Sequence, residues 1–95
     1  MNKYELVFIL DPKLDAQAQK KETDKIEKLI ASFKGKIEKK EAWGRKTLAY
    51  PIKKLTEGIY VKFDLNFPPE NIIEWEKKIK LEEKVIRYLL IKVER

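Results

Sequence analysis

The apolar and polar positions of this 95-residue chain follow two kinds of repeat, which predict four strands and two helices. Lys3–Leu10 and Gly58–Phe67 alternate with a period of two, which is typical of strands that bury one face. Lys36–Tyr50 is predicted as a strand with a break at Gly44, because glycine inside a strand pattern indicates a bulge or bend. Val85–Val93 is predicted as the last strand, although both of its faces are apolar.

Two segments have the three-to-four-residue spacing of amphipathic helices. The first is predicted between Asp15, which suits an N-cap, and Gly35, which suits a helix end. The second begins at Pro68-Pro69-Glu70, since proline and an acidic residue favour a helix N-terminus. Residues from Pro51 to Glu57 are predicted to form a connecting loop. The apolar stripes of the two helices are Ile26, Leu29, Ile30 and Phe33, and Ile72, Trp75 and Ile79.

The order strand-helix-strand-strand-helix-strand is that of the ferredoxin-like α+β fold, and residues 1–95 are predicted to form a single domain. Two helices should cover one sheet face and leave the other open. Strand alternation assigns to the covered face Leu6, Phe8, Val61, Phe63, Leu65, Tyr88 and Leu90. It assigns to the open face Val7, Ile9, Tyr60, Lys62, Arg87, Leu89 and Ile91. Clustered exposed apolar side chains mark binding surfaces, so the open face is predicted to hold a protein partner.

The charge of the chain is concentrated in one segment. The chain has 22 Lys and Arg against 16 Asp and Glu, a net charge of +6. The segment from Lys34 to Lys54 holds eight basic and two acidic residues, whereas the remainder is neutral overall. A basic stripe on a small domain is typical of a nucleic-acid surface, but lysines also protect edge strands from aggregation. Charge alone leaves both interpretations open.

The composition argues against catalysis. The chain has no Cys and no His, which excludes disulfides, thiol or imidazole chemistry, and metal sites built from those residues. Carboxylates such as Glu22, Asp24 and Glu27 lie among lysines and are predicted to be solvated, and the three glycines are too far apart for a phosphate loop. We therefore expect a non-enzymatic protein without cofactor or metal. Since its longest apolar run is Leu6–Leu10, we expect it to be cytoplasmic.

Two interpretations compete with RNA binding through the basic segment. The apolar open face also suits a protein-interaction or regulatory module that pairs through its sheet and binds no nucleic acid. Gly58–Phe63 loosely matches a motif with which RNA-recognition domains stack bases on their sheet. The match lacks one residue, and the first strand offers Val7 and Ile9 where those domains use aromatic residues. Base stacking on the sheet is therefore the weakest of the three.

Five strings in the chain stand out together: Tyr4-Glu5, Leu10-Asp11-Pro12, Trp43-Gly44-Arg45-Lys46, Leu48-Ala49-Tyr50-Pro51-Ile52 and Gly58-Ile59-Tyr60. Through them the chain resembles the bacterial small-subunit ribosomal protein S6 family, from about Asn2 to Glu94. The resemblance implies a four-stranded antiparallel sheet with two helices on one face, in a structural protein that is not an enzyme. It also implies a place in the cytoplasmic ribosome, bound with ribosomal protein S18 to the central domain of the small-subunit rRNA, in the platform region.

The resemblance and the strand positions together assign candidate contact residues. The RNA candidates within or after the matched string are Arg45, Lys46, Lys53 and Lys54. The RNA candidates by strand position alone are Lys3, Arg87 and Lys92. The partner candidates on the open face are Val7, Ile9, Tyr60, Leu89 and Ile91. Trp43, beside the predicted bend, either joins the partner surface or caps the edge of the core.

Overall fold

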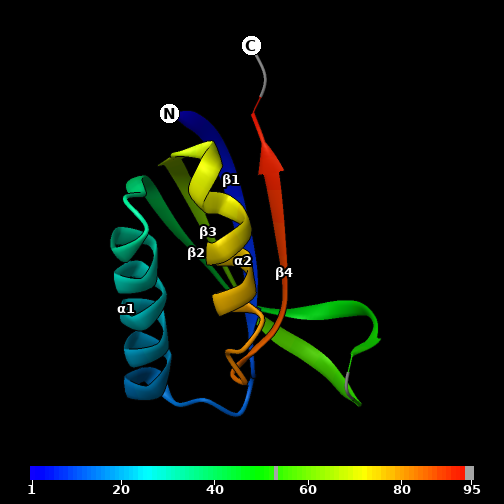
Figure 1. Cartoon of the computed structure of the whole chain (residues 1–95). Helices are drawn as coiled ribbons and strands as arrows, with labels where there is room; N and C mark the ends of the chain where they lie inside the picture. The colour runs from blue at the N-terminus through cyan, green and yellow to red at the C-terminus, as the bar shows by residue number, and fades with distance from the viewer. Residues whose placement is uncertain (53, 94–95) are drawn as a thin grey trace.

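The computed structural model describes residues 1–52 and 54–93, and its elements follow the predicted order. The four strands form one antiparallel sheet in the order β2-β3-β1-β4, and both helices lie on the same face of it (Figure 1). The ferredoxin-like prediction is therefore confirmed. The elements are β1 (Asn2–Leu10), α1 (Ala16–Ser32), β2 (Lys36–Ile52), β3 (Leu55–Phe67), a 3₁₀ turn (Pro69–Asn71), α2 (Ile72–Ile79) and β4 (Val85–Lys92).

The register of the strands decides which side chains share a face. Phe8 of β1 lies opposite Val61 of β3 and Tyr88 of β4, and all three pack in the core beneath the helices. The next residue, Ile9, lies opposite Tyr60, so this row points to the open face. The predicted division into a covered and an open face is thus confirmed, including the last strand.

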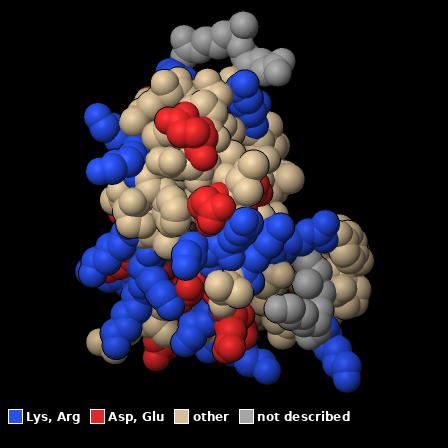
Figure 2. Space-filling view, viewed as in Figure 1, with Lys and Arg blue, Asp and Glu red and all other residues tan. Residues whose placement is uncertain are grey.

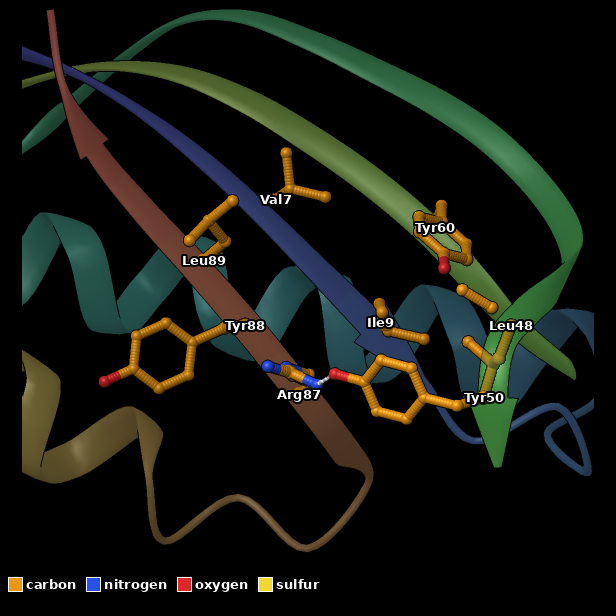
Figure 3. Close-up of a pocket in the computed structure, with 9 residues that line it drawn as sticks. Val7, Ile9, Leu48, Tyr50, Tyr60, Arg87, Tyr88 and Leu89 are labelled. Atoms are coloured by element: carbon orange, nitrogen blue, oxygen red, sulfur yellow. Dashed lines mark hydrogen bonds between the residues drawn. The ribbon is translucent and has the colours of Figure 1, made fainter. Parts of the chain in front are cut away.

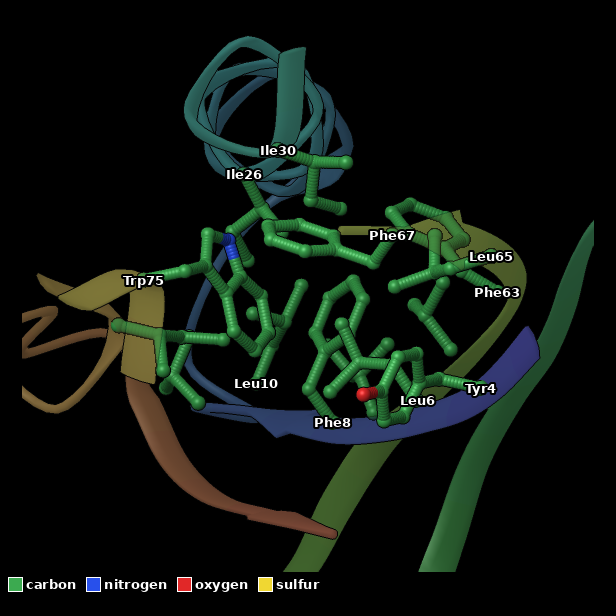
Figure 4. Close-up of a cluster of buried hydrophobic side chains, with 14 residues drawn as sticks. Tyr4, Leu6, Phe8, Leu10, Ile26, Ile30, Phe63, Leu65, Phe67 and Trp75 are labelled. Atoms are coloured by element: carbon green, nitrogen blue, oxygen red, sulfur yellow. The ribbon is translucent and has the colours of Figure 1, made fainter. Parts of the chain in front are cut away.

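The main core lies between the helices and the covered face of the sheet. Trp75 of α2 is fully buried, and its ring centroid lies 5.7 Å from that of Phe67. Phe8 and Phe63, from neighbouring strands, pack edge to face with centroids 5.1 Å apart, an arrangement that aromatic quadrupoles favour. Ile26 of α1 closes the cluster from the other helix (Figure 4). This close packing makes the sheet a rigid support for its open face.

The start of α1 follows the prediction, whereas its end differs. The Asp15 carboxylate accepts a hydrogen bond from the Ala18 amide at 2.8 Å, which caps the helix. At the other end, the residue in the left-handed conformation is Lys34, with φ of 70°, and not Gly35 as expected. A Cβ on Gly35 would lie 2.4 Å from the Phe67 ring. Glycine is therefore needed at this position for close packing rather than for its backbone conformation.

The second and third strands form a longer hairpin than the sequence predicts. The expectation of a loop from Pro51 to Glu57 is wrong, because β2 continues to Ile52 and β3 begins at Leu55. Proline is tolerated there since β2 is an edge strand and need not donate on its outer side. The predicted break at Gly44 is confirmed as a bulge, with the pairing of β2 and β3 shifting between Ala42 and Gly44. The hairpin tip projects from the body of the protein (Figure 1).

The last strand is joined to α2 by a hydrogen bond. The Tyr88 hydroxyl donates to the Glu76 carboxylate at 3.1 Å. Burial, together with this contact, raises the pKa of Tyr88 to about 12. β4, the edge strand paired with β1, is thereby also held to the helix layer (Figure 1).

Candidate RNA and partner interfaces

The open face of the sheet carries an apolar groove of about 330 Å³. Its floor is partly a second buried cluster, in which Ile9 of β1, Leu48 of β2 and Ile86 of β4 pack together. Figure 3 shows the groove on the side of the sheet opposite the helices. The residues that line it are Val7, Ile9, Leu48, Ala49, Tyr50, Tyr60, Arg87, Tyr88 and Leu89.

One end of the groove is closed by a contact between the two edge strands. Arg87 of β4 donates a hydrogen bond to the Tyr50 hydroxyl of β2 (Figure 3). Its guanidinium carbon also lies 5.5 Å from the centroid of the Tyr50 ring, a cation–π arrangement. The end of β2 must therefore pass over the open face, which the strong right-handed twist of a two-stranded hairpin permits.

Beyond Val7, the open face becomes polar. Lys62, opposite Val7, has its ammonium 3.9 Å from Glu5, 3.7 Å from Glu41 and 3.7 Å from Asp64. Three carboxylates around one ammonium satisfy its charge locally, so Lys62 is unsuited to bind a phosphate. This ion-pair network bounds the groove on the side of β1 and β3, whereas exposed apolar surface continues along β4 at Ile91.

The predicted partner residues are largely brought together by the fold. Val7, Ile9, Tyr60 and Leu89 line the groove, and Ile91 lies farther along β4 on the same face, opposite Glu5. The sequence interpretation missed Leu48 and Tyr50 as groove residues. Their spacing of two after the Gly44 break was the available signal, since it places them on one face.

Trp43 does not line the groove and does not cap the main core. It lies on edge strand β2 with 41% of its surface exposed, and the Lys46 ammonium is 5.1 Å from its ring centroid. The two alternatives that the sequence left open for this residue are therefore both poorly supported by its position.

The RNA candidates of the matched string lie along the projecting hairpin. Arg45 is exposed, with its guanidinium 3.5 Å from the Glu57 carboxylate across the hairpin. Lys46 is exposed on the same strand, and Lys54 is exposed at the tip, where its φ is 66°. Lys53 lies outside the described residues. The described cations of this group thus follow one edge of the protein.

The three candidates assigned by strand position are dispersed. Lys3 and Lys92 lie at the far end of the sheet from the hairpin tip, where the Lys3 carbonyl accepts a hydrogen bond from Val93 at 2.8 Å. They point to opposite faces, because Lys92 is opposite Tyr4 of the covered face. Arg87 lies in the groove. No single surface of the described chain contains all the predicted RNA residues.

Cationic side chains are also present on the helix side. Figure 2 shows Lys and Arg gathered over the lower half of that view, with Asp and Glu among them. Several of these acids are already paired, as in the contacts of Lys25 with Glu82 at 3.0 Å and of Lys40 with Glu27 at 3.2 Å. The net positive excess comes from the segment between Lys34 and Lys54, which supplies β2 of the hairpin and also Lys40 of this mixed surface.

One predicted solvated carboxylate is buried instead. Glu22 of α1 has 5% of its surface exposed. Burial, a hydrogen bond with Glu82, and the Glu82 charge raise the pKa of Glu22, against the opposing effect of Lys25 and Lys84. The carboxyl pair packs α1 against the turn before β4. The prediction failed because lysines flank Glu22 along the helix, whereas its burial is imposed by a distant segment.

The described residues offer neither a metal-binding cluster nor a helix that could span a membrane. They contain no group of three or more His, Cys, Asp or Glu placed to hold a metal ion. Within the same part of the chain, every helix is too short or too polar to cross a membrane.

Comparison with known protein families identifies the family of this chain. The family model described as ribosomal protein S6 matches residues 3–92. The chain belongs to the ribosomal protein S6 family. It is 37% identical to the small ribosomal subunit protein bS6 of Dictyoglomus turgidum, over all of this chain and 98% of the relative. It is 35% identical to the bS6 protein of Clostridium acetobutylicum, over the full length of both.

A solved S6 structure has the same fold. The crystal structure of the 30S ribosomal protein S6 of Thermotoga maritima superposes with a TM-score of 0.91 at 29% identity. The match covers 97% of this chain and 87% of that protein. Members of the S6 family are structural, non-enzymatic proteins of the cytoplasmic small ribosomal subunit in bacteria. The resemblance found in the sequence, the expected fold class and the absence of an enzymatic role are therefore confirmed.

Proposed function

We propose that this S6 protein binds the small-subunit rRNA jointly with ribosomal protein S18, each through a separate surface. The observation that carries the proposal is the β2–β3 hairpin. Its exposed edge presents Arg45, Lys46 and Lys54, while Leu48 and Tyr50 of the same strand turn into the apolar groove. The β2–β3 hairpin would thus support both the RNA contact and the partner contact. The assignment to the central domain, and of S18 as the partner, follows from the family resemblance.

The RNA contact is electrostatic. Cations along a projecting hairpin reach phosphate groups without requiring the sheet to approach the RNA closely. Lys53 is proposed as part of this contact from its place in the sequence, next to Lys54. Lys3 and Lys92, at the opposite end of the sheet, are proposed as a weaker and separate RNA contact.

The partner contact is apolar. The groove buries Ile9 and Leu48 at its base and leaves Leu89 56% exposed at its rim, so a covering chain would remove apolar surface from water. Arg87, held by Tyr50, supplies a polar group at the rim. We assign it to the partner side rather than to RNA.

A second candidate function is a module that pairs through its sheet and binds no nucleic acid. Edge strand β4 favours it, since Leu89 and Ile91 are exposed along a strand with a free outer edge. A stable homodimer of the free protein in light scattering would favour this module. A monomer would favour the ribosomal scaffold.

Affinity purification tests the main proposal. The tagged chain is recovered from lysate of the source bacterium, with and without ribonuclease. We expect small-subunit rRNA and S18 together in the untreated sample, and S18 retained after digestion. Recovery of the chain without small-subunit rRNA would contradict the proposal.

A further inference from the structure

Trp43 is the exposed member of the two tryptophans in the chain. Its exposed fraction is 41%, whereas Trp75 is fully buried in the core. An indole that stays 41% exposed on an edge strand contributes less to folding by burial than a core tryptophan does. Because it lies outside the apolar groove, the partner surface does not account for it either.

The backbone around Trp43 is specialised to present this side chain. The pairing of β2 with β3 shifts between Ala42 and Gly44, which leaves Trp43 as the extra residue of a bulge. Gly44 has φ of 79°, a left-handed conformation that residues with a side chain rarely adopt. A Cβ at Gly44 would meet nothing within 4 Å, so glycine is required there by conformation and not by space. Bulges of this kind re-aim a side chain and recur beside functional sites.

A cation lies over the Trp43 ring, although Glu41 and Arg45 are equally near to it in the chain. The Lys46 ammonium lies 5.1 Å from the ring centroid, and Arg45 follows two residues after the tryptophan. An aromatic face beside cations is the arrangement with which proteins bind unpaired nucleotides, because every base has a face to stack and a phosphate to neutralise. A tryptophan that anchors a protein partner is instead expected within an apolar patch.

We propose that Trp43 stacks on an unpaired base of the bound RNA, with Lys46 at the adjacent phosphate. The inference rests on the proposed function and adds the class of ligand that this residue takes. It differs from base stacking on the sheet, because Trp43 belongs to the edge of the sheet and not to its central strands.

Tryptophan fluorescence tests the inference directly, since the buried Trp75 serves as an internal reference. The probe is a transcript of the small-subunit rRNA central domain, titrated into the protein with S18 present. We expect the transcript to quench emission from Trp43. In Trp43→Phe, where only Trp75 emits, the same titration should leave emission nearly unchanged.

Binding of the same transcript gives the energetic test. Trp43→Leu should weaken it by about 5- to 150-fold, the range expected when one stacking aromatic side chain is removed. Trp43→Phe, which keeps an aromatic face, should retain most of the affinity. Circular dichroism checks that both variants fold, as expected for an exposed position.

The failures of the two proposals are distinguishable. If wild-type protein with S18 does not bind the transcript, the proposed function and this inference are both overturned. If the wild type binds and Trp43→Leu binds equally well, only this inference is overturned. Quenching of Trp43 by S18 without RNA would show a protein contact and would likewise overturn the inference.

Discussion

Arg87 donates a hydrogen bond to the hydroxyl of Tyr50, although β4 and β2 lie at opposite edges of the sheet. The guanidinium also lies over the tyrosine ring, 5.5 Å from its centroid. This pair closes one end of the groove and holds the hairpin against the open face. It therefore couples the proposed RNA element to the proposed partner surface.

Replacement of this pair should affect binding more than folding. Arg87→Ala and Tyr50→Phe should each change the free energy of unfolding by less than about 1 kcal/mol, because both residues are exposed. Each should weaken S18 binding, and the two effects should be non-additive in a double-mutant cycle measured by calorimetry. Additive effects would mean that the pair does not act as a unit.

A charge at the rim of the groove should prevent partner binding. Leu89→Asp places a carboxylate on an apolar contact surface and should lower S18 affinity at least about 10-fold, measured by calorimetry. Leu81→Asp is the matched control, since Leu81 is 73% exposed in the turn after α2 and away from the groove. Equal reductions in the two variants would exclude the groove as the partner site.

Removal of the tip cations should reduce the salt dependence of RNA binding. Lys53→Ala/Lys54→Ala should lower the slope of log affinity against log salt by about 1 for each phosphate that is no longer neutralised. Lys78→Ala/Lys80→Ala removes the same charge from the exposed end of α2 and should leave the slope nearly unchanged. Filter binding at several salt concentrations measures both. An unchanged slope in the tip variant would mean that the RNA binds elsewhere.

The buried Glu22 predicts a pH dependence of stability. Its pKa in the folded protein is raised above the ordinary value of 4.5 by burial and by Glu82. At pH values between the ordinary pKa and the raised pKa of the folded protein, the folded protein holds more protons than the unfolded chain. The free energy of unfolding therefore falls as pH rises through this range. Glu22→Gln removes this decrease and should be more stabilising, relative to wild type, at pH 7 than at pH 4. Urea unfolding measures the difference, with Asp24→Asn at an exposed position of α1 as the control.

An equal effect of Glu22→Gln at the two pH values would contradict the assignment of Glu22 as the titrating group. So would an effect of Asp24→Asn of the same size and pH dependence.

The sequence was sufficient to predict the division of the sheet into two faces. In β1 and β3 only one face is strongly apolar, so a period of two determines the side of each residue. β4 was ambiguous because both of its faces are apolar, and in the structure Ile86 joins Ile9 and Leu48 in a buried cluster on the open side. Its register against β1, a long-range property, resolved the ambiguity.

The features that the sequence did not predict depend on contacts between distant segments. The Tyr50–Arg87 pair requires the twist of a hairpin whose length was underestimated at Pro51, because local patterns treat proline as a break. The burial of Glu22 requires the turn before β4. The sequence already predicted an apolar face apart from the basic segment, but only the fold shows that Leu48, Tyr50 and Arg87 line the groove.

The most direct test of the account is the affinity of this protein for the central-domain transcript, measured with and without S18 at two salt concentrations. The account predicts weak binding by the protein alone and much tighter, salt-sensitive binding when S18 occupies the groove. Equal affinity with and without S18 would contradict it.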